Sequence, residues 1–309
     1  MYHFIINPSS RSGKGQKIWK QQLEPYLQSK GIESTVHLSK QPGDIASLMK
    51  LLSNNCGVQD RIVLLGGDGT LNEALQGVTP YSNVPIGYIP TGSSNDFARD
   101  VKLPTDPVKA LQIILDAKEA TPLDIGVLTY PDGQTTYFAG SSGIGFDAAV
   151  CEAASTTGQK GLFNRLGLGK LTYTAIAIKQ LAKSPRISGE IRLDDKDPIR
   201  IDNMIFTCVM VHRFEGGGFL FCPDADATDG ILNLCSAGDI PKSVIPLAMI
   251  AAFQGKHFKY KGVTPYAAKK VVIRTEEPLW VHTDGEVIRR SNEITVTCLQ
   301  KALPMYLPG

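Results

Sequence analysis

Three glycines and one acid follow an apolar run in the first quarter of the chain. The stretch "LLGGDGTLNEALQG" covers residues 64–77 and contains Gly66, Gly67, Asp68 and Gly69 in succession. Glycines held in such a run indicate positive φ angles or the close approach of a ligand. Their bare backbone amides, together with the N-terminus of a following helix, would attract an anionic phosphate. Asp68 alone would repel that phosphate, so we expect a divalent cation between them.

A second polar loop follows the next apolar run, "VPIGYI". The segment "PTGSSNDFARD" covers residues 90–100, with Thr91 at the end of the expected strand and Asn95 and Asp96 at the start of the next helix. This segment alone could be a plain helix cap. Because parallel strands carry their ligand-binding loops at the same edge of a sheet, two polar strand ends side by side favour one shared ligand.

Other interpretations of the glycine motifs are weaker. A tight turn capped by an acid would explain one or two glycines of residues 66–69, but not all three with the polar residues that follow. The segment "SRSGKG" fails as a phosphate loop, since Pro8 stands where glycine is needed and Gly15 where a hydroxyl is needed. The segment "GIGFDA" (143–148) fits a dinucleotide fingerprint only loosely, because no acid ends a following strand at the right distance.

The elements around these loops alternate between strands and helices up to about Asp124. Strands are expected at "YHFIIN", "ESTVHL", "RIVLL" and "VPIGYI". Helices are expected over residues 16–30, ending at Gly31, and from Asp44, which is expected to be the N-cap. Repetition of this kind predicts a doubly wound α/β domain with helices on both faces of a parallel sheet.

After Asp124 the pattern changes to strand-like runs with few helices between them. We expect a β-rich, sandwich-like second domain over residues 126–298, and a first domain of 1–125 with 299–309. Two helices are expected within the second domain: an amphipathic one over 167–184, and a buried one at "SVIPLAMIAAF" (243–253). A cleft between the two domains is the expected place for a site.

Composition supports a folded two-domain protein of 309 residues, with 42% hydrophobic and 20% charged residues. No signal peptide pattern opens the chain, no apolar stretch is long enough to span a bilayer, and six cysteines lack pair spacing, so we expect a cytoplasmic protein with reduced thiols. The net charge of +2 favours no partner. Two clusters of basic residues could nevertheless contact phosphate or an anionic membrane: Arg11, Lys14, Lys17 and Lys20, and Lys160, Arg165, Lys170, Lys179 and Lys183.

A family resemblance rests on several motifs that occur in a fixed order. The chain resembles the diacylglycerol kinase catalytic family, and most closely the bacterial soluble lipid kinases, in "NPSSRSGKG", "GGDGTLNEALQG", "PTGSSNDFAR", "PLDIG", "GIGFDA", "PDADATDGIL" and "HTDGE". It departs from the family at Ser93, where threonine is usual, and in a slightly longer first motif. The resemblance implies a fold of the NAD kinase and diacylglycerol kinase type, with a nucleotide-binding first domain and a lipid-binding second domain.

The resemblance also implies cofactors and the residues that hold them. ATP would be held by Asn7, Pro8, Ser9, Ser10, Arg11, Ser39, Gly66, Gly67, Asp68, Gly69, Thr70, Leu71, Asn72 and Thr91. A catalytic Mg²⁺ would be organised through water by Asp68, Asp96 and Asp124. A structural Mg²⁺ would be bound by the Asp229 carboxylate and the carbonyls of Asp226 and Ile231. Without the resemblance, this last segment reads as a calcium-like acidic turn or a hairpin.

The general base is implied to lie in "TDGE", as Asp284 or Glu286. Asp-Gly is also the commonest two-residue hairpin turn, so a structural role is the alternative. The implied reaction is transfer of the γ-phosphate to a lipid hydroxyl, with diacylglycerol giving phosphatidic acid as the leading case in phospholipid biosynthesis. NAD kinase and a nucleotide-binding membrane regulator without turnover are the alternatives. The expected partners are a lipid alcohol and, transiently, an anionic membrane, with no nucleic acid; a homodimer is left open.

Overall fold

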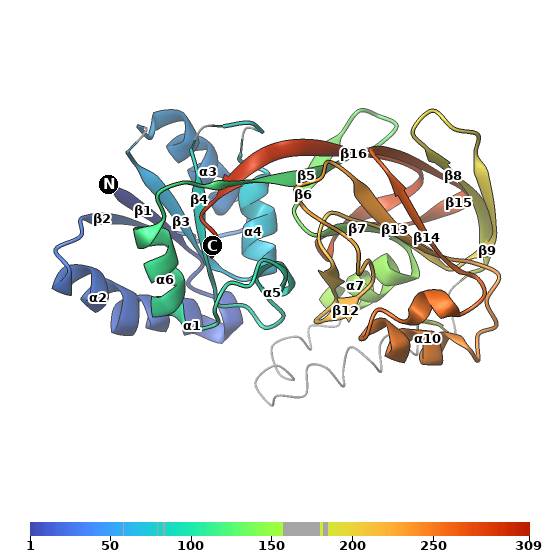
Figure 1. The fold of residues 1–309 in the computed structure, drawn as a ribbon, viewed down its shortest axis with the longest axis horizontal. Helices are drawn as coiled ribbons and strands as arrows, with labels where there is room; N and C mark the ends of the chain where they lie inside the picture. Colours follow the sequence, from blue (N-terminus) through green and yellow to red (C-terminus); the bar gives the residue numbers. More distant parts are fainter. Residues whose placement is uncertain (58, 79, 83, 157–179, 182–184) are drawn as a thin grey trace. The chain divides into compact units, whose positions relative to one another are not determined.

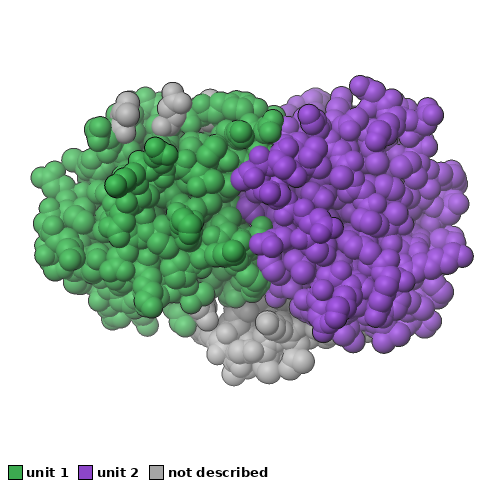
Figure 2. Space-filling model, viewed as in Figure 1, with its two compact units in different colours: residues 1–125, 299–309 green, residues 126–298 purple. Residues whose placement is uncertain are grey.

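The computed structural model describes residues 1–309 except 58, 79, 83, 157–179 and 182–184, and except the side chains of Arg11, Ser12 and Thr156 (Figure 1). The expected basic cluster from Lys160 to Lys183 and nearly all of the expected helix over 167–184 lie outside the described residues. The chain divides into two compact units, unit 1 with residues 1–125 and 299–309, and unit 2 with residues 126–298 (Figure 2).

Unit 1 is built on a parallel sheet. Its strands are β1 (Tyr2–Ile6), β2 (Ser34–Leu38), β3 (Arg61–Gly66) and β4 (Ile86–Pro90), in the order β2-β1-β3-β4. Every pair in this order is parallel, and Met305, at the end of β16 (Glu286–Met305), pairs with β4 in the same direction. The expected parallel sheet is therefore confirmed, and the carboxyl ends of its strands lie at one edge.

Helices cover both faces of this sheet (Figure 1). They are α1 (Ser10–Ile18), a π-helical turn (Trp19–Leu23), α2 (Glu24–Ser29), α3 (Asp44–Asn55), α4 (Asp68–Leu75), α5 (Asp96–Asp100) and α6 (Pro107–Asp116). On one face Phe4 and Ile6 pack with Trp19, Leu23 and Leu111. Side chains alternate along a strand, so the residues between them serve the other face, where α3 contacts β1 and α4 contacts β3. This is the doubly wound arrangement that the sequence predicts.

The start of α3 differs from the prediction. The N-cap is Gly43, in a left-handed conformation with φ of 92°, and Asp44 is the first helical residue. Oε1 of Glu73 instead accepts hydrogen bonds from the amides of Gly43 and Ile45, at 2.6 and 3.1 Å. The prediction of Asp44 as the cap is wrong because an acid on the neighbouring α4 satisfies these amides, which local sequence does not reveal.

Unit 2 consists mainly of antiparallel strands. They are β5 (Thr121–Thr129), which enters it from unit 1, β6 (Thr135–Phe138), β7 (Ser141–Gly145), β8 (Ile187–Leu193), β9 (Ile199–Met204), β10 (Phe206–Met210), β11 (Phe214–Glu215), β12 (Phe219–Leu220), β13 (Leu232–Ala237), β14 (Val263–Ala268), β15 (Lys270–Thr283) and most of β16. The first half of β15 pairs with β8, and its last residues pair with β7, with an irregularity between Arg274 and Leu279. One strand thus belongs to two groups of strands, in keeping with the predicted β-rich second domain.

The helical segments of unit 2 include α7 (Phe146–Thr156), α10 (Ile245–Ala252) and a 3₁₀ turn, η2 (His257–Lys259). The helix expected near residue 245 is confirmed, but its full burial is wrong. Its Ile245 and Ala248 belong to the core of unit 2, whereas Leu247 and Ile250 are 55% and 66% exposed. No helix among the described residues is long and apolar enough to cross a bilayer.

Candidate functional site

The two glycine loops of unit 1 lie against each other. The amide of Thr91 donates to the carbonyl of Gly66 at 2.7 Å. A Cβ atom added to Gly92 would lie 2.6 Å from the Cα of Gly67, and one added to Gly66 would lie 2.3 Å from the Thr70 hydroxyl oxygen. The expected adjacency of the two loops is confirmed. Gly66 and Gly67 are required because the protein's own atoms approach them, and neither has a positive φ.

The loop after β3 ends at the N-terminus of α4. Gly67 is the N-cap and has no side chain to offer, and its carbonyl accepts hydrogen bonds from the amides of Thr70 and Leu71, at 2.9 and 3.1 Å. The first turn of this helix begins with Asp68. Backbone amides and the positive end of the helix dipole therefore face the edge of the sheet where β3 ends, an arrangement that favours an anion.

Hydroxyl and amide side chains from three strand ends surround this helix start. Nδ2 of Asn7, after β1, donates to Oγ1 of Thr70 at 3.2 Å. The hydroxyls of Ser10 and Thr91 are 2.9 Å apart, although the residues are far apart in the chain. Oδ1 of Asn7 also accepts from the Ser9 amide at 3.1 Å and the Ser9 hydroxyl at 2.8 Å. These predicted nucleotide contacts are thus brought together.

Ser39, another predicted nucleotide contact, follows β2, where its amide donates to the carbonyl of Ile6 at 3.0 Å. Among the residues that the structure describes, no hydrogen bond joins its hydroxyl to Asn7, Thr70 or Thr91. The side chain of Arg11 lies outside the described part of the chain.

Two of the three predicted magnesium-organising acids are in direct contact. The Asp96 amide donates to Oδ2 of Asp68 at 3.3 Å, and the Asp96 carboxylate pairs with Arg99. Burial raises the pKa of Tyr88 well above its usual value, and the negative charge of Asp68 adds to this shift. The third acid, Asp124, is 1% exposed in β5, where its Oδ1 accepts from the Lys301 amide at 2.7 Å.

The predicted base lies in a tight hairpin of unit 2. Thr283 pairs with Glu286, and between them Asp284 and Gly285 have φ angles of 49° and 83°, as a type I′ turn requires. The structural alternative, a two-residue hairpin, is therefore present. The side chain of Glu286 is exposed at the start of β16.

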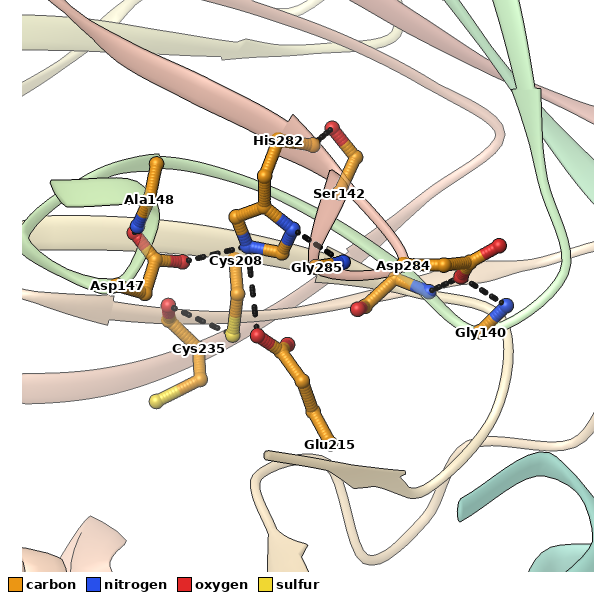
Figure 3. Close-up of polar contacts among 11 residues, drawn as sticks. Gly140, Ser142, Asp147, Ala148, Cys208, Glu215, Cys235, His282, Asp284 and Gly285 are labelled. Carbon is orange, nitrogen blue, oxygen red and sulfur yellow. Dashed lines mark hydrogen bonds and ion pairs between the residues drawn. The ribbon is translucent and has the colours of Figure 1, made fainter. Parts of the chain in front are cut away.

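The Asp284 carboxylate holds the loop before β7. It accepts hydrogen bonds from the amides of Ala139 at 3.0 Å and Ser141 at 2.9 Å, and from the amide of Gly140 at 2.7 Å (Figure 3). The Asp284 amide donates to the Ser141 carbonyl at 2.8 Å. A carboxylate with three such donors is strongly oriented by the backbone. The two acids of the turn therefore differ, since the contacts of Asp284 fasten the fold.

A buried cluster of ionisable side chains adjoins this turn. His282 is 0% exposed, and its Nε2 lies 3.3 Å from Oδ2 of Asp147 and 3.3 Å from Oε1 of Glu215 (Figure 3). The amide of Gly285 donates to Nδ1 of His282 at 3.1 Å. The cluster thus connects α7, β11 and β15 to the hairpin that carries Glu286.

The cluster holds a shared proton. The Gly285 amide requires a lone pair on Nδ1, which leaves the ring proton on Nε2, facing the carboxylates. Burial raises the pKa of Glu215 to about 8. Burial alone would lower the pKa of His282, but Glu215 and Asp147 raise it to about 9. Because Nδ1 keeps its lone pair for the Gly285 amide, the proton that the pair retains at neutral pH lies on Glu215 or between Glu215 and Nε2 of His282.

The three ligand-type atoms also lie within 4.8 Å of one another, as they would around a metal ion. A cation on Nε2 of His282 would, however, make Nδ1 a proton donor that faces the donating amide of Gly285. A proton therefore fits this cluster better than a metal ion.

Sequence reasoning did not single out this cluster. His282 and Asp147 are 135 residues apart, so no local spacing reveals them. They meet because β7 pairs with β15, which places His282 opposite Gly143. Gly143 also leaves room for Asp147, since a Cβ atom added to Gly143 would lie 1.9 Å from Oδ2 of Asp147. The one usable signal was that both residues stand inside motifs, "GIGFDA" and "HTDGE".

The acidic segment after β12 forms an exposed turn. Oδ1 of Asp226 accepts from the Thr228 amide at 3.0 Å and hydroxyl at 2.7 Å, and Oδ1 of Asp229 accepts from the Ile231 amide at 2.8 Å. The Asp229 amide donates to the Asp226 carbonyl at 3.4 Å, and Gly230 has a φ of 77°. Carboxylate and carbonyl oxygens are thus gathered within one short turn.

Comparisons with known proteins agree with this architecture. Residues 1–128 match the diacylglycerol kinase catalytic domain, and residues 140–307 match the YegS C-terminal NAD kinase beta sandwich-like domain. The chain belongs to the diacylglycerol kinase catalytic family, which is a family of lipid kinases.

Individual relatives cover most of the chain. YtlR of Bacillus subtilis, named as a candidate lipid kinase, is 27% identical over 93% of this chain and 93% of its own. A diacylglycerol kinase of the same species is 28% identical over 91% of this chain and 88% of its own, and one of Mycobacterium tuberculosis is 29% identical over 74% and 70%. A crystal structure from Bacillus anthracis, of a candidate diacylglycerol kinase, shares the fold with a TM-score of 0.78 at 20% identity, and covers 99% of this chain and 95% of its own.

Proposed function

We propose that the protein transfers the γ-phosphate of ATP to the hydroxyl of a lipid alcohol, with diacylglycerol as the leading acceptor and phosphatidic acid as the product. The observation that carries the proposal is the contact between the two glycine loops at the strand ends of unit 1, through the Thr91 amide and the Gly66 carbonyl. Phosphoryl transfer depends mainly on positioning and charge neutralisation, which such a cradle of backbone donors supplies.

In this proposal the nucleotide is held at the edge of the parallel sheet. The residues that hold it are Asn7 to Arg11, Ser39, Gly66 to Asn72 and Thr91. Support comes from the side-chain contacts between Asn7 and Thr70 and between Ser10 and Thr91, which fix the polar groups around the start of α4. These groups would orient the terminal phosphate and exclude water from one side of it.

Magnesium would be held by Asp68, Asp96 and Asp124. The contact of the Asp96 amide with the Asp68 carboxylate supports one shared ion site for Asp68 and Asp96. Carboxylate oxygens are ligands that this ion prefers, directly or through water. When bound, the ion would neutralise charge on the phosphate oxygens. We propose the turn from Asp226 to Ile231 as a second, structural site, because its oxygen donors suit a hard cation.

We propose Glu286 as the group that accepts the proton of the lipid hydroxyl. Its side chain is exposed, whereas the Asp284 carboxylate already accepts from three backbone amides. A carboxylate in that position holds the turn, so that Asp284 would position the base without taking the proton itself.

A radiolabel experiment tests the proposal. The protein is incubated with γ-labelled ATP and Mg²⁺, and with diacylglycerol in detergent micelles or with NAD. Labelled phosphatidic acid would support the lipid kinase. Labelled NADP would identify an NAD kinase, and ATP binding in calorimetry without any labelled product from a panel of lipid alcohols would favour a regulator; either result would overturn the proposal.

A further inference from the structure

The outer face of α10 exposes large apolar side chains. Leu247, Ile250 and Phe253 are 55%, 66% and 51% exposed. With a helical repeat of 100° per residue, Leu247, Ile250 and Phe253 lie on one side of the helix axis, and Ile245 and Ala248 lie on the other, where they join the core of unit 2. The helix is therefore apolar on both sides, which for a short surface helix indicates a partner that takes up the outer face.

The chain segment that contains α10 is basic. Residues 240–275 contain no Asp or Glu, but they contain six lysines and one arginine. Lys242 precedes the helix and Lys256 follows it, and both are exposed. The turn η2, which contacts α10, carries the exposed Lys259. An apolar face with positive charges at its rim is complementary to a layer of anionic lipid headgroups over acyl chains.

The length and packing of the helix restrict how it could meet a bilayer. α10 has eight residues, too few to span one, and its inner side is held by the core of unit 2. The ring of Phe253 stacks on Phe219 with centroids 4.0 Å apart, so this aromatic group is held in place at the end of the exposed face. Only shallow insertion parallel to the surface is compatible with these contacts.

We infer that Leu247, Ile250 and Phe253, with the lysines around them, form a docking surface for anionic membranes. The inference rests on the proposed function in one respect, because a kinase acting on a water-insoluble lipid must meet it in a bilayer. It also goes beyond that function, since it assigns attachment to α10 and η2 rather than to the basic residues of α1. The area of three side chains suits weak, reversible attachment, which the nearby positive charges strengthen.

Vesicle co-sedimentation without nucleotide tests the surface apart from catalysis. The wild-type chain should bind vesicles of equimolar phosphatidylcholine and phosphatidylglycerol, and bind phosphatidylcholine vesicles weakly. Leu247→Gln with Ile250→Gln should lower the affinity for the anionic vesicles at least about tenfold. Lys256→Gln with Lys259→Gln should lower it too, and should reduce its dependence on salt. The matched control is Leu51→Gln on α3 of unit 1, where the side chain is 56% exposed and no loss is expected.

A second measurement tests whether a second copy of the chain, rather than a membrane, binds to this face. Analytical ultracentrifugation of the wild type and of the Leu247→Gln, Ile250→Gln variant shows whether a second copy covers the face. The inference would be overturned if the Leu247→Gln, Ile250→Gln variant bound vesicles as well as the wild type, or if the control lost as much binding as this variant. It would also be overturned if the wild type were a dimer that bound no vesicles and the variant were a monomer. Because vesicle binding needs no ATP, failure of the lipid kinase assay alone would overturn the proposed function and leave this result standing.

Discussion

The acids at the strand ends of unit 1 and those around the hairpin of unit 2 belong to motifs of the same family but have different partners. Asp68 and Asp96 are the first residues of α4 and α5, next to the backbone amides and hydroxyls of the glycine loops, and the Asp68 carboxylate accepts from the Asp96 amide. In unit 2, the Asp284 carboxylate accepts from three backbone amides, and Oδ2 of Asp147 lies 3.3 Å from Nε2 of His282. The comparison teaches that acids in motifs of one family can have different hydrogen-bond partners, and it predicts that the acids of unit 1 serve a ligand whereas Asp284 serves the fold.

The largest effect is expected for Asp68→Asn. The amide oxygen of asparagine can still accept from Asp96, so the fold should persist, but a charge that would hold the cation is lost. Lipid kinase turnover should fall about 10³-fold, the range seen when one electrostatic group of an active site is removed. The measurement is initial rate at saturating ATP, with circular dichroism as the check on folding. Turnover within a factor of a few of wild type would show that Asp68 is structural.

Asp284→Ala should act on stability. It leaves three backbone amides without their carboxylate, and hydrogen bonds to charged groups contribute about 1.5–3 kcal/mol each, of which solvent at this half-buried position recovers a part. We expect a loss of about 3 kcal/mol in the free energy of unfolding, measured by urea denaturation. A stable variant without activity would instead make Asp284 the base.

Glu286→Gln should give the opposite result to Asp284→Ala. With no loss of stability, kcat should fall about 10²-fold, as expected when a general base is removed. Glu277→Gln, on an exposed residue of β15, is the control and should leave kcat unchanged. If both glutamine variants behave alike, the proton must be taken by another group.

The buried cluster predicts a pH dependence of stability. The pKa values of Glu215 and His282 are raised to about 8 and about 9 in the folded protein, so the folded state binds more protons than the unfolded state. Stability from this source is complete below the unfolded values and is lost as pH rises through the folded ones. The free energy of unfolding should therefore decrease between pH 7 and pH 9.

Two substitutions of His282 separate its contacts. His282→Asn keeps an acceptor near Nδ1 for the Gly285 amide but loses the donor to the carboxylates, and His282→Gln places a donor near Nε2. Both variants should reduce the pH dependence of the free energy of unfolding. Only His282→Asn should preserve the Asp284–Gly285 turn, and kcat at pH 7 should therefore be retained in that variant alone. If the free energy of unfolding changed with pH in both variants as it does in the wild type, the shared proton would not be the cause of the pH dependence.

The smallest effect is expected for Glu73→Ala. The change removes the acceptor for the Gly43 and Ile45 amides at the start of α3, and the loss of such a cap costs about 1 kcal/mol. Thermal unfolding should show a small decrease, whereas Glu119→Ala, on an exposed residue, should show none. A large loss of activity with little change in stability would place Glu73 in the site.

Local patterns predicted the fold class well and the tertiary contacts poorly. Alternation of β1 to β4 with helices was visible in apolar spacing, and the glycine loops were found because both follow apolar strands. The exposure of Leu247 could not be predicted, since an apolar helix reads as buried from its composition. The meeting of His282 with Asp147 could not be predicted either, because it follows from the pairing of β7 with β15.

The close approach of Gly67 and Gly92 has a mechanical consequence. A Cβ atom added to Gly67 would lie only 2.9 Å from the Cα of Gly92, so the two segments are in close backbone contact and neither can move toward the other. A phosphate that binds there would contact a rigid site whose backbone groups already have their bound positions. Little ordering entropy would then be lost on binding, so affinity would arise from preorganisation more than from closure.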